Sequence, residues 1–228
     1  MSSATIIGLA TPAGAYLARL LRARGYRVTG SATDSATAAA MLAAVGADEV
    51  TLLEDPFEGT ASAEVYLLDG AMTLAGALAA WPDARVLTTA AEPAQDGRFA
   101  VAARLGDHAS RLDPPDSPVL ATCRAVRDRQ ALPAVDTAPR DLGWTPEYVD
   151  ALWRTLQADM PADATIRSGE ALSQRDIARH AAEYFKVAVD LPPEGPAVAT
   201  MASGPPGWRA FTCGRELVRA LCEGLPPG

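Results

Sequence analysis

Short apolar stretches alternate with amphipathic helices from residue 4 to residue 105, and this alternation limits the chain to few folds. Ala4–Gly8 and Tyr26–Thr29 predict strands, and Gly14–Arg24 between them predicts a helix that Gly25 ends as a C-cap. The same pattern continues with helices expected at Ala36–Val45 and Ala71–Trp81 and strands at Glu49–Leu53, Glu64–Leu68, Arg85–Thr89 and Phe99–Leu105. It predicts an α/β fold with a parallel sheet covered on both faces.

The pattern loosens after residue 110. We expect helices and one strand separated by Pro-rich segments: helices at Val119–Arg129, Thr145–Ala158, Ser173–Phe185 and Arg215–Glu223, a strand at Thr165–Ser168, a turn at Leu112–Pro118 and a loop at Pro192–Gly207. The fold class is therefore predicted as a trimmed Rossmann-type parallel sheet, residues 1–110, with a small C-terminal α/β lobe, residues 111–228, or one compact unit. The cleft between them, at the carboxyl ends of the strands, is the expected ligand site.

Composition and charge exclude several classes of function. The net charge of −8 and the absence of an Arg cluster argue against nucleic-acid binding. No apolar run approaches the roughly 18 residues that span a bilayer, and the first ten residues do not resemble a signal peptide. Three cysteines without metal spacing and two histidines predict reduced thiols, no metal site and a cytoplasmic protein.

The first turn, Gly8-Leu-Ala-Thr11-Pro-Ala-Gly14, has glycines where a dinucleotide-binding turn needs its first and third. Thr11 stands at the middle position, where its branched side chain occupies the space of the phosphates. Asp34, beyond the second strand, is placed to bond a ribose hydroxyl. The alternatives are a turn that binds nothing and a solvated helix cap at Asp34.

Three segments carry a resemblance to a known family. Residues 6–30 form the opening strand, turn, helix and strand; residues 136–157 contain Arg-Asp and then Tyr-Val-x-Ala-x-Trp; and residues 166–177 contain Gly-Glu-x-x-Ser-x-Arg. Together they resemble the GDP-mannose 4,6-dehydratase-like members of the extended short-chain dehydrogenase/reductase family. The Asp107-His108-Ala109-Ser110 stretch is similar to that family's Asn-His-Glu-Ser. The resemblance covers nearly the whole of a chain that is shorter than such enzymes.

The resemblance implies a nicotinamide enzyme that oxidises a nucleotide sugar at C4, eliminates water and returns the hydride. That cycle needs a Tyr followed four residues later by a Lys. This chain lacks the pair, because Lys186 is its one lysine and the residue four positions before it is Ala182. The family's catalytic hydroxyl position is Ala90, and its glutamate base corresponds to Glu92. We therefore expect no cofactor, with NAD(P) binding disfavoured.

The candidate site residues follow from these comparisons. Glu92, His108 and Asp107 are the candidate acid–base groups, and Arg140 and Thr89 the candidate substrate contacts. Gly8, Thr11, Gly14 and Asp34 would form a degenerate cofactor site. Three of these residues have an alternative role. Glu92 would be an exposed loop carboxylate, His108 a half-buried histidine, and Arg140 an ion-pair partner of Asp136 or Asp141.

The function expected from sequence is that of a degenerate dehydratase-like protein. It would carry out a non-redox acid–base step (isomerisation, elimination or cyclisation) in deoxysugar or specialised-metabolite biosynthesis, on a nucleotide sugar or a polyketide-type metabolite. The alternative is a catalytically inactive accessory subunit of a partner enzyme. The resemblance also implies self-association or a partner chain, because the family dimerises through helices of which one carries the missing Tyr and Lys.

Overall fold

The computed structural model describes residues 2–55, 57, 62–90, 100–134, 138–158 and 163–225. The chain forms two compact units. Unit 1 comprises residues 1–105, 148–166 and 204–208, and unit 2 comprises residues 106–147, 167–203 and 209–228. The predicted boundary after residue 110 lies near the first crossing, whereas residues 148–166 and 204–208 belong to unit 1 and not to the C-terminal unit.

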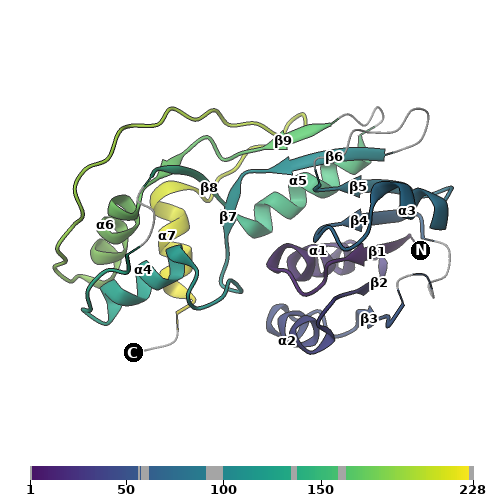
Figure 1. Cartoon of the computed structure of the whole chain (residues 1–228), viewed down its shortest axis with the longest axis horizontal. Helices are drawn as coiled ribbons and strands as arrows, with labels where there is room; N and C mark the ends of the chain where they lie inside the picture. The colour runs from purple at the N-terminus through teal and green to yellow at the C-terminus, as the bar shows by residue number, and fades with distance from the viewer. Residues whose placement is uncertain are drawn as a thin grey trace. The chain divides into compact units, whose positions relative to one another are not determined.

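Unit 1 is built on a seven-stranded sheet in which every strand pair is parallel. The strand order is β3-β2-β1-β4-β5-β6-β9 (Figure 1). The strands are β1 (Ser3–Ile7), β2 (Arg27–Ser31), β3 (Thr51–Leu52), β4 (Glu64–Leu67), β5 (Arg85–Thr88), β6 (Ala100–Leu105) and β9 (Ala164–Ile166). This is the doubly wound order of dinucleotide-binding folds with one added strand, so the predicted α/β class is confirmed.

Helices α1 (Pro12–Ala23), α2 (Ser35–Val45) and α5 (Thr145–Gln157) are the long helices next to this sheet. Apolar strand residues such as Ile6 and Leu87 are fully buried on the face that α1 and α5 cover. The guanidinium of Arg24, just after α1, stacks on the ring of Trp153 in α5 at 3.6 Å. This contact joins two helices that are far apart in sequence.

Below α5 the same face holds a buried carboxylate, Glu64, at the start of β4. Its oxygens accept hydrogen bonds from the hydroxyls of Tyr26, at 2.9 Å, and Tyr66, at 2.7 Å, and from the amide of Gln157, at 2.9 Å. Glu64 is only 6% exposed. It lies at the amino end of its strand, the edge opposite to the one where such folds bind ligands, so we assign it a structural role.

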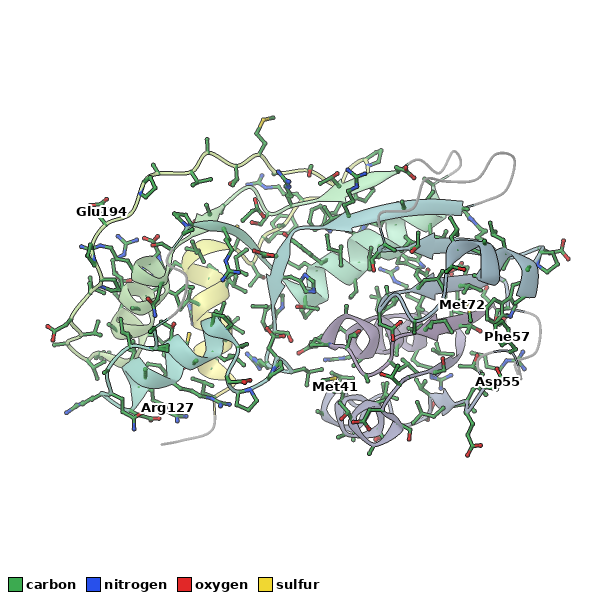
Figure 2. All side chains as sticks on the ribbon, viewed as in Figure 1. Met41, Asp55, Phe57, Met72, Arg127 and Glu194 are labelled. Carbon is green, nitrogen blue, oxygen red and sulfur yellow. The ribbon has the colours of Figure 1, made fainter. Side chains whose placement is uncertain are left out.

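The opposite face of the sheet is covered, among the described residues, by the short helix α3 (Leu74–Ala80). Residues of α3, β1, β4, β5 and β6 form one apolar cluster there, against which Met72 packs. Phe57 stacks on Trp81 at 5.9 Å between ring centroids, and Figure 2 shows Phe57 and Met72 at this end of unit 1. Toward β2 this face becomes polar, since the hydroxyls of Thr5 and Thr29 lie 3.1 Å apart.

Unit 2 consists of a three-stranded sheet with three helices packed on it (Figure 1). The strand order is β10-β8-β7, with β7 (Asp107–Ala109), β8 (Arg140–Trp144) and β10 (Ala171–Leu172). Helices α4 (Pro118–Arg127), α6 (Gln174–Phe185) and α7 (Gly214–Glu223) form its apolar core with Ala109, Leu142 and Leu172. The four predicted C-terminal helices are all present, but none of these three short strands was predicted.

A long irregular segment, residues 187–202, connects α6 to the last part of the chain, as the Pro/Gly content predicts. Its first residues, including Val189 and Leu191, pack on the core of unit 2. At its far end Ser203 exchanges backbone hydrogen bonds with Arg167. Glu194 lies between these two anchored ends (Figure 2).

Candidate functional site

The turn between β1 and α1 has the shape of a dinucleotide-binding turn. Gly8 has a φ of +106°, and a side chain at Gly14 would place its Cβ 2.2 Å from the carbonyl oxygen of Gly8. Both glycines are therefore required by the backbone itself, because an L-residue rarely adopts the first conformation and the second position has no space.

The side chain of Thr11 makes two hydrogen bonds within this turn. Its Oγ1 accepts a hydrogen bond from the backbone N–H of Gly14 at 3.0 Å and donates one to the carbonyl of Gly8 at 2.7 Å. Thr11 is thus the N-cap of α1, and it uses a helix N-terminal N–H that would otherwise be available to a phosphate. The prediction placed Thr11 in the space of the phosphates, and its hydroxyl lies at the helix end that would bind them.

A second feature that disfavours a pyrophosphate at this turn is Asp69, which follows β4. A Cβ built on Gly8 would lie 3.0 Å from the carboxyl carbon of Asp69, so this side chain borders the turn. A carboxylate this close would repel a pyrophosphate at the same place. Sequence analysis did not single out Asp69, because its position next to Gly8 results from the pairing of β1 with β4.

The side chains of Asp34 and Thr89 also make hydrogen bonds within the protein. Asp34 is the N-cap of α2 and accepts hydrogen bonds from the backbone N–H and the hydroxyl of Thr37, at 3.0 and 2.7 Å. These bonds hold the pKa of Asp34 below its usual value. The hydroxyl of Thr89 lies 3.3 Å from the carbonyls of Leu67 and Leu68 and donates to them. Asp34 thus occupies the cap position that was its alternative role.

Glu92, the candidate base after β5, lies outside the described residues, as does Asp136. Their roles stay predictions from sequence.

In unit 2, Arg140 pairs with Asp107. Its Nε lies 3.7 Å from Oδ2 of Asp107, and both side chains are about half exposed, at 47% and 53%. Asp141 makes a different set of contacts, since its carboxylate accepts bonds from the N–H groups of Ser168 and Gly169 at 2.9 and 2.8 Å. The guanidinium of Arg140 therefore partly offsets the repulsion that the Asp107 carboxylate would exert on an anion.

The hollow beside Arg140 is too small for a ligand. Its walls are mostly apolar, from α4, β8, β10 and α6, with Arg140 and Gln174 among the lining residues. Its volume is about 20 Å³, against roughly 300 to 1,000 Å³ for a small-molecule site. A water molecule fits there, and a sugar does not.

His108 and Asp107 point away from each other. They are consecutive residues of β7, and side chains alternate between the two faces of a strand. Asp107 is on the face of Leu142 and the helical core, whereas His108 is on the face of Gly143. These two candidates therefore do not converge on one pocket.

Beyond β7, Ser110 and Asp113 form a polar pair, and sequence analysis did not single out Asp113. The hydroxyl of Ser110 donates to Asp113 at 2.7 Å, and the Nδ1 of His108 lies 3.0 Å from the carbonyl of Gly106. The signal available in the sequence was the i, i+3 spacing of Ser110 and Asp113, which is typical of a hydroxyl–carboxylate turn.

Cys213 is the N-cap residue of α7 and does not have the properties of a nucleophile. Burial, followed by a hydrogen bond to Glu170, raises the pKa of the Cys213 thiol to about 12. A thiol needs a lowered pKa to react as a thiolate. In the part of the chain that the structure describes, no cluster of His, Cys, Asp and Glu could hold a metal ion, and no helix is long and apolar enough to cross a bilayer.

Comparison with known proteins identifies the fold. A scan against protein-family models and a search of curated proteins both find no match. Solved structures do match, over nearly their whole length. A dTDP-glucose 4,6-dehydratase from Bacillus anthracis, in complex with NAD, has a TM-score of 0.75 at 6% identity and covers 98% of this chain and 96% of its own.

A UDP-glucose 4-epimerase from Thermotoga maritima, with UDP-glucose, has a TM-score of 0.72 at 11% identity, with coverage of 97% and 98%. A UDP-N-acetylglucosamine 4-epimerase from Methanobrevibacter ruminantium, in complex with UDP-N-acetylmuramic acid, has a TM-score of 0.68 at 10% identity, with coverage of 98% and 97%. The chain therefore shares the fold of these sugar-nucleotide epimerases and this dehydratase. At these identities the likeness concerns the fold alone.

Proposed function

We propose that this chain, with the fold of sugar-nucleotide epimerases and dehydratases, carries out a non-redox acid–base step on a nucleotide sugar or a related metabolite. The reaction would be an isomerisation, elimination or cyclisation in deoxysugar or specialised-metabolite biosynthesis. No nicotinamide cofactor takes part.

The proposal that redox chemistry has been lost rests on one observation. The hydroxyl of Thr11 caps α1 at the helix end where such folds bind the cofactor's phosphates. Asp69 adds negative charge beside the same turn. The missing Tyr-x-x-x-Lys pair has the same consequence, because without a tyrosinate a sugar hydroxyl is not deprotonated for hydride transfer.

The experiment that tests the loss of redox chemistry is a fluorescence titration of the purified protein with NADPH and NADH. We expect no saturation in the low-micromolar range. The matched variant is Thr11→Gly, which removes the cap hydroxyl and leaves the two flanking glycines in place. Low-micromolar binding by the unchanged chain would overturn the proposal.

The acid–base step has its own test. A proton abstracted next to a carbonyl exchanges with solvent, so incubation with nucleotide 4-keto sugars in D₂O should place deuterium at the carbon beside the ketone, visible by proton NMR. Absence of exchange from any such sugar, with no new product, would favour the second candidate below.

The second candidate is an accessory subunit that binds and stabilises a partner enzyme. It is favoured by the internal hydrogen bonds of Thr11, Asp34 and Thr89, because each of these candidate ligand contacts is already used by the protein itself. Native mass spectrometry of the protein as purified distinguishes the two candidates: a bound small molecule supports the enzyme, and a stoichiometric second protein supports the accessory subunit.

A further inference from the structure

Unit 2 has a hollow where the chain leaves the carboxyl ends of α4 and α6. Its walls come from the last turn of α4 (residues 125–126), from residues 129–132 after that helix, and from residues 188–190 after α6. All of these residues belong to unit 2. The volume of the hollow is about 350 Å³, within the roughly 300 to 1,000 Å³ of small-molecule sites. A small molecule therefore has room here, unlike in the hollow beside Arg140.

The lining of this hollow combines apolar side chains with two opposite charges. Val126 is 1% exposed and belongs to the core of unit 2, and Leu132 and Val189 pack against the same core. Arg129 and Asp190 are exposed. Among the residues that the structure describes, the side chains of these two form no ion pair with each other and no hydrogen bond or ion pair with a third residue. A ligand with an apolar body, one anionic group and one cationic group would complement these walls.

Arg129 has a backbone conformation that glycine adopts more readily. Its φ is +54°, directly after the C-cap of α4. At the ends of α1 and α2 the chain has Gly25 and Gly46, with φ of +82° and +68°. An L-residue is disfavoured in this conformation and glycine is not. Strain of this kind persists at ligand-binding positions, where the side chain is needed.

We propose that this hollow binds a zwitterion with an aliphatic body, which is the chemistry of a free amino acid. The guanidinium of Arg129 binds the carboxylate of the ligand through two parallel N–H donors. The carboxylate of Asp190 accepts hydrogen bonds from the ammonium group, and the side chains of Val126, Leu132 and Val189 contact the aliphatic part. None of these residues is a candidate for the acid–base step or for cofactor binding, so the inference goes beyond the proposed function.

The first test is a titration of the ¹⁵N-labelled protein with L-leucine, followed through the backbone amide resonances. We expect saturable shifts concentrated in residues 125–132 and 188–190. 4-Methylpentanoate lacks the ammonium group and isoamylamine lacks the carboxylate, so each should bind about tenfold or more weakly, the usual effect of losing one charge-assisted hydrogen bond. The inference would be overturned if L-leucine, L-valine and L-methionine all leave these amides unshifted, or if either analogue binds as tightly as L-leucine.

The second test uses matched glycine variants. Arg129→Gly removes the guanidinium at a position whose backbone suits glycine, so the amide spectrum outside the hollow should be unchanged while L-leucine binds about tenfold or more weakly. Lys186 has a φ of +56° at the end of α6 and is not among the residues that line the hollow. A positive charge favours the carboxyl end of either helix, so Lys186→Gly is the control and should leave L-leucine binding unchanged.

Asp190→Asn provides a second, independent variant. It should weaken the binding of L-leucine and leave that of 4-methylpentanoate unchanged, because only the first ligand has an ammonium group. Unchanged L-leucine binding by Arg129→Gly or by Asp190→Asn, or equal losses in Arg129→Gly and Lys186→Gly, would contradict the assignment of this site. None of these outcomes alters the NADPH titration that tests the proposed function.

Discussion

A single buried carboxylate, Glu64, connects three elements of unit 1 through hydrogen bonds. Its donors come from the residue before β2 (Tyr26), from β4 itself (Tyr66) and from α5 (Gln157). Burying a charge is costly unless its lone pairs are satisfied, so each donor supports the others. This residue-scale network has a consequence for stability.

Tyr66→Phe keeps the ring and removes the hydroxyl that donates to Glu64. We expect the free energy of unfolding to fall by about 1–3 kcal/mol, the usual cost of an unsatisfied buried polar group. Urea denaturation monitored by circular dichroism measures the change. Tyr184→Phe, at a partly exposed ring, is the control and should stay within about 0.5 kcal/mol. Equal effects of the two changes would show that the network does not stabilise the fold.

The cap at Asp34 leads to a prediction about how the stability of α2 depends on pH. Its hydrogen bonds to Thr37 lower its pKa, so the folded-state value is below the unfolded one. The cap therefore stabilises α2 above the unfolded pKa, near 4, and this contribution is lost as the pH falls through the folded pKa. Thr37→Val removes the hydroxyl donor, and the pKa of Asp34 should rise in a ¹³C titration. Thr51→Val, on β3, should leave it unchanged.

Glu92→Gln tests the candidate base that sequence analysis placed after β5. The substitution keeps size and hydrogen bonding and removes the base, so turnover of any substrate found should fall by roughly a hundredfold or more. The free energy of unfolding should change by less than about 1 kcal/mol. Full turnover with a folded variant would remove Glu92 from the mechanism and leave His108 as the candidate.

At the scale of elements, α6 begins with a complete capping box. The hydroxyl of Ser173 and the carboxylate of Asp176 satisfy each other's backbone N–H groups. Ser173→Ala should lower the free energy of unfolding by about 1 kcal/mol in thermal or urea denaturation. Ser35→Ala makes the same change at the exposed first residue of α2, where Asp34 is the cap, and should have a smaller effect. If Ser173→Ala leaves the free energy of unfolding unchanged, packing alone fixes the start of α6.

The elements of unit 1 could be predicted because each strand is a short apolar run between turn signals. The start of α6 could be predicted from the Ser173 capping pattern. Strands β7 and β10 could not, because they have only three and two residues, and β8 could not, because its five residues include Arg140, Asp141 and Gly143. They form because their neighbours supply hydrogen-bonding partners, which periodicity does not report.

The site shows the same limit. The sequence identified Thr11, Arg140 and His108 as residues of interest. It did not show that Asp69 borders Gly8 or that Arg140 pairs with Asp107, because both depend on strand pairing. Asp107 and His108 were grouped as neighbours in sequence, whereas strand alternation separates their side chains.

At the scale of the whole molecule, we expect the chain to self-associate or to pair with another protein. Among the described residues, the face of the sheet opposite α1 and α5 is covered by α3, a helix of seven residues. The connection from β5 to β6 is only residues 89–99, too short for a helix as long as α1 together with its turns. Light scattering should give a mass above that of one chain, and a monomer without a copurifying partner would contradict this.

The division of the chain between its two units determines the order in which they can be completed during synthesis. The path crosses between the units five times, and residues 204–208 belong to unit 1. Trp208 in this late segment packs edge-on against Tyr148, with ring centroids 6.0 Å apart, and fits over Gly204. A nascent chain on the ribosome can thus form β1 to β6 early, but unit 1 is complete only after residue 208 has emerged. Neither unit corresponds to one uninterrupted stretch of coding sequence, so neither could be transferred intact to another protein by a single gene fusion.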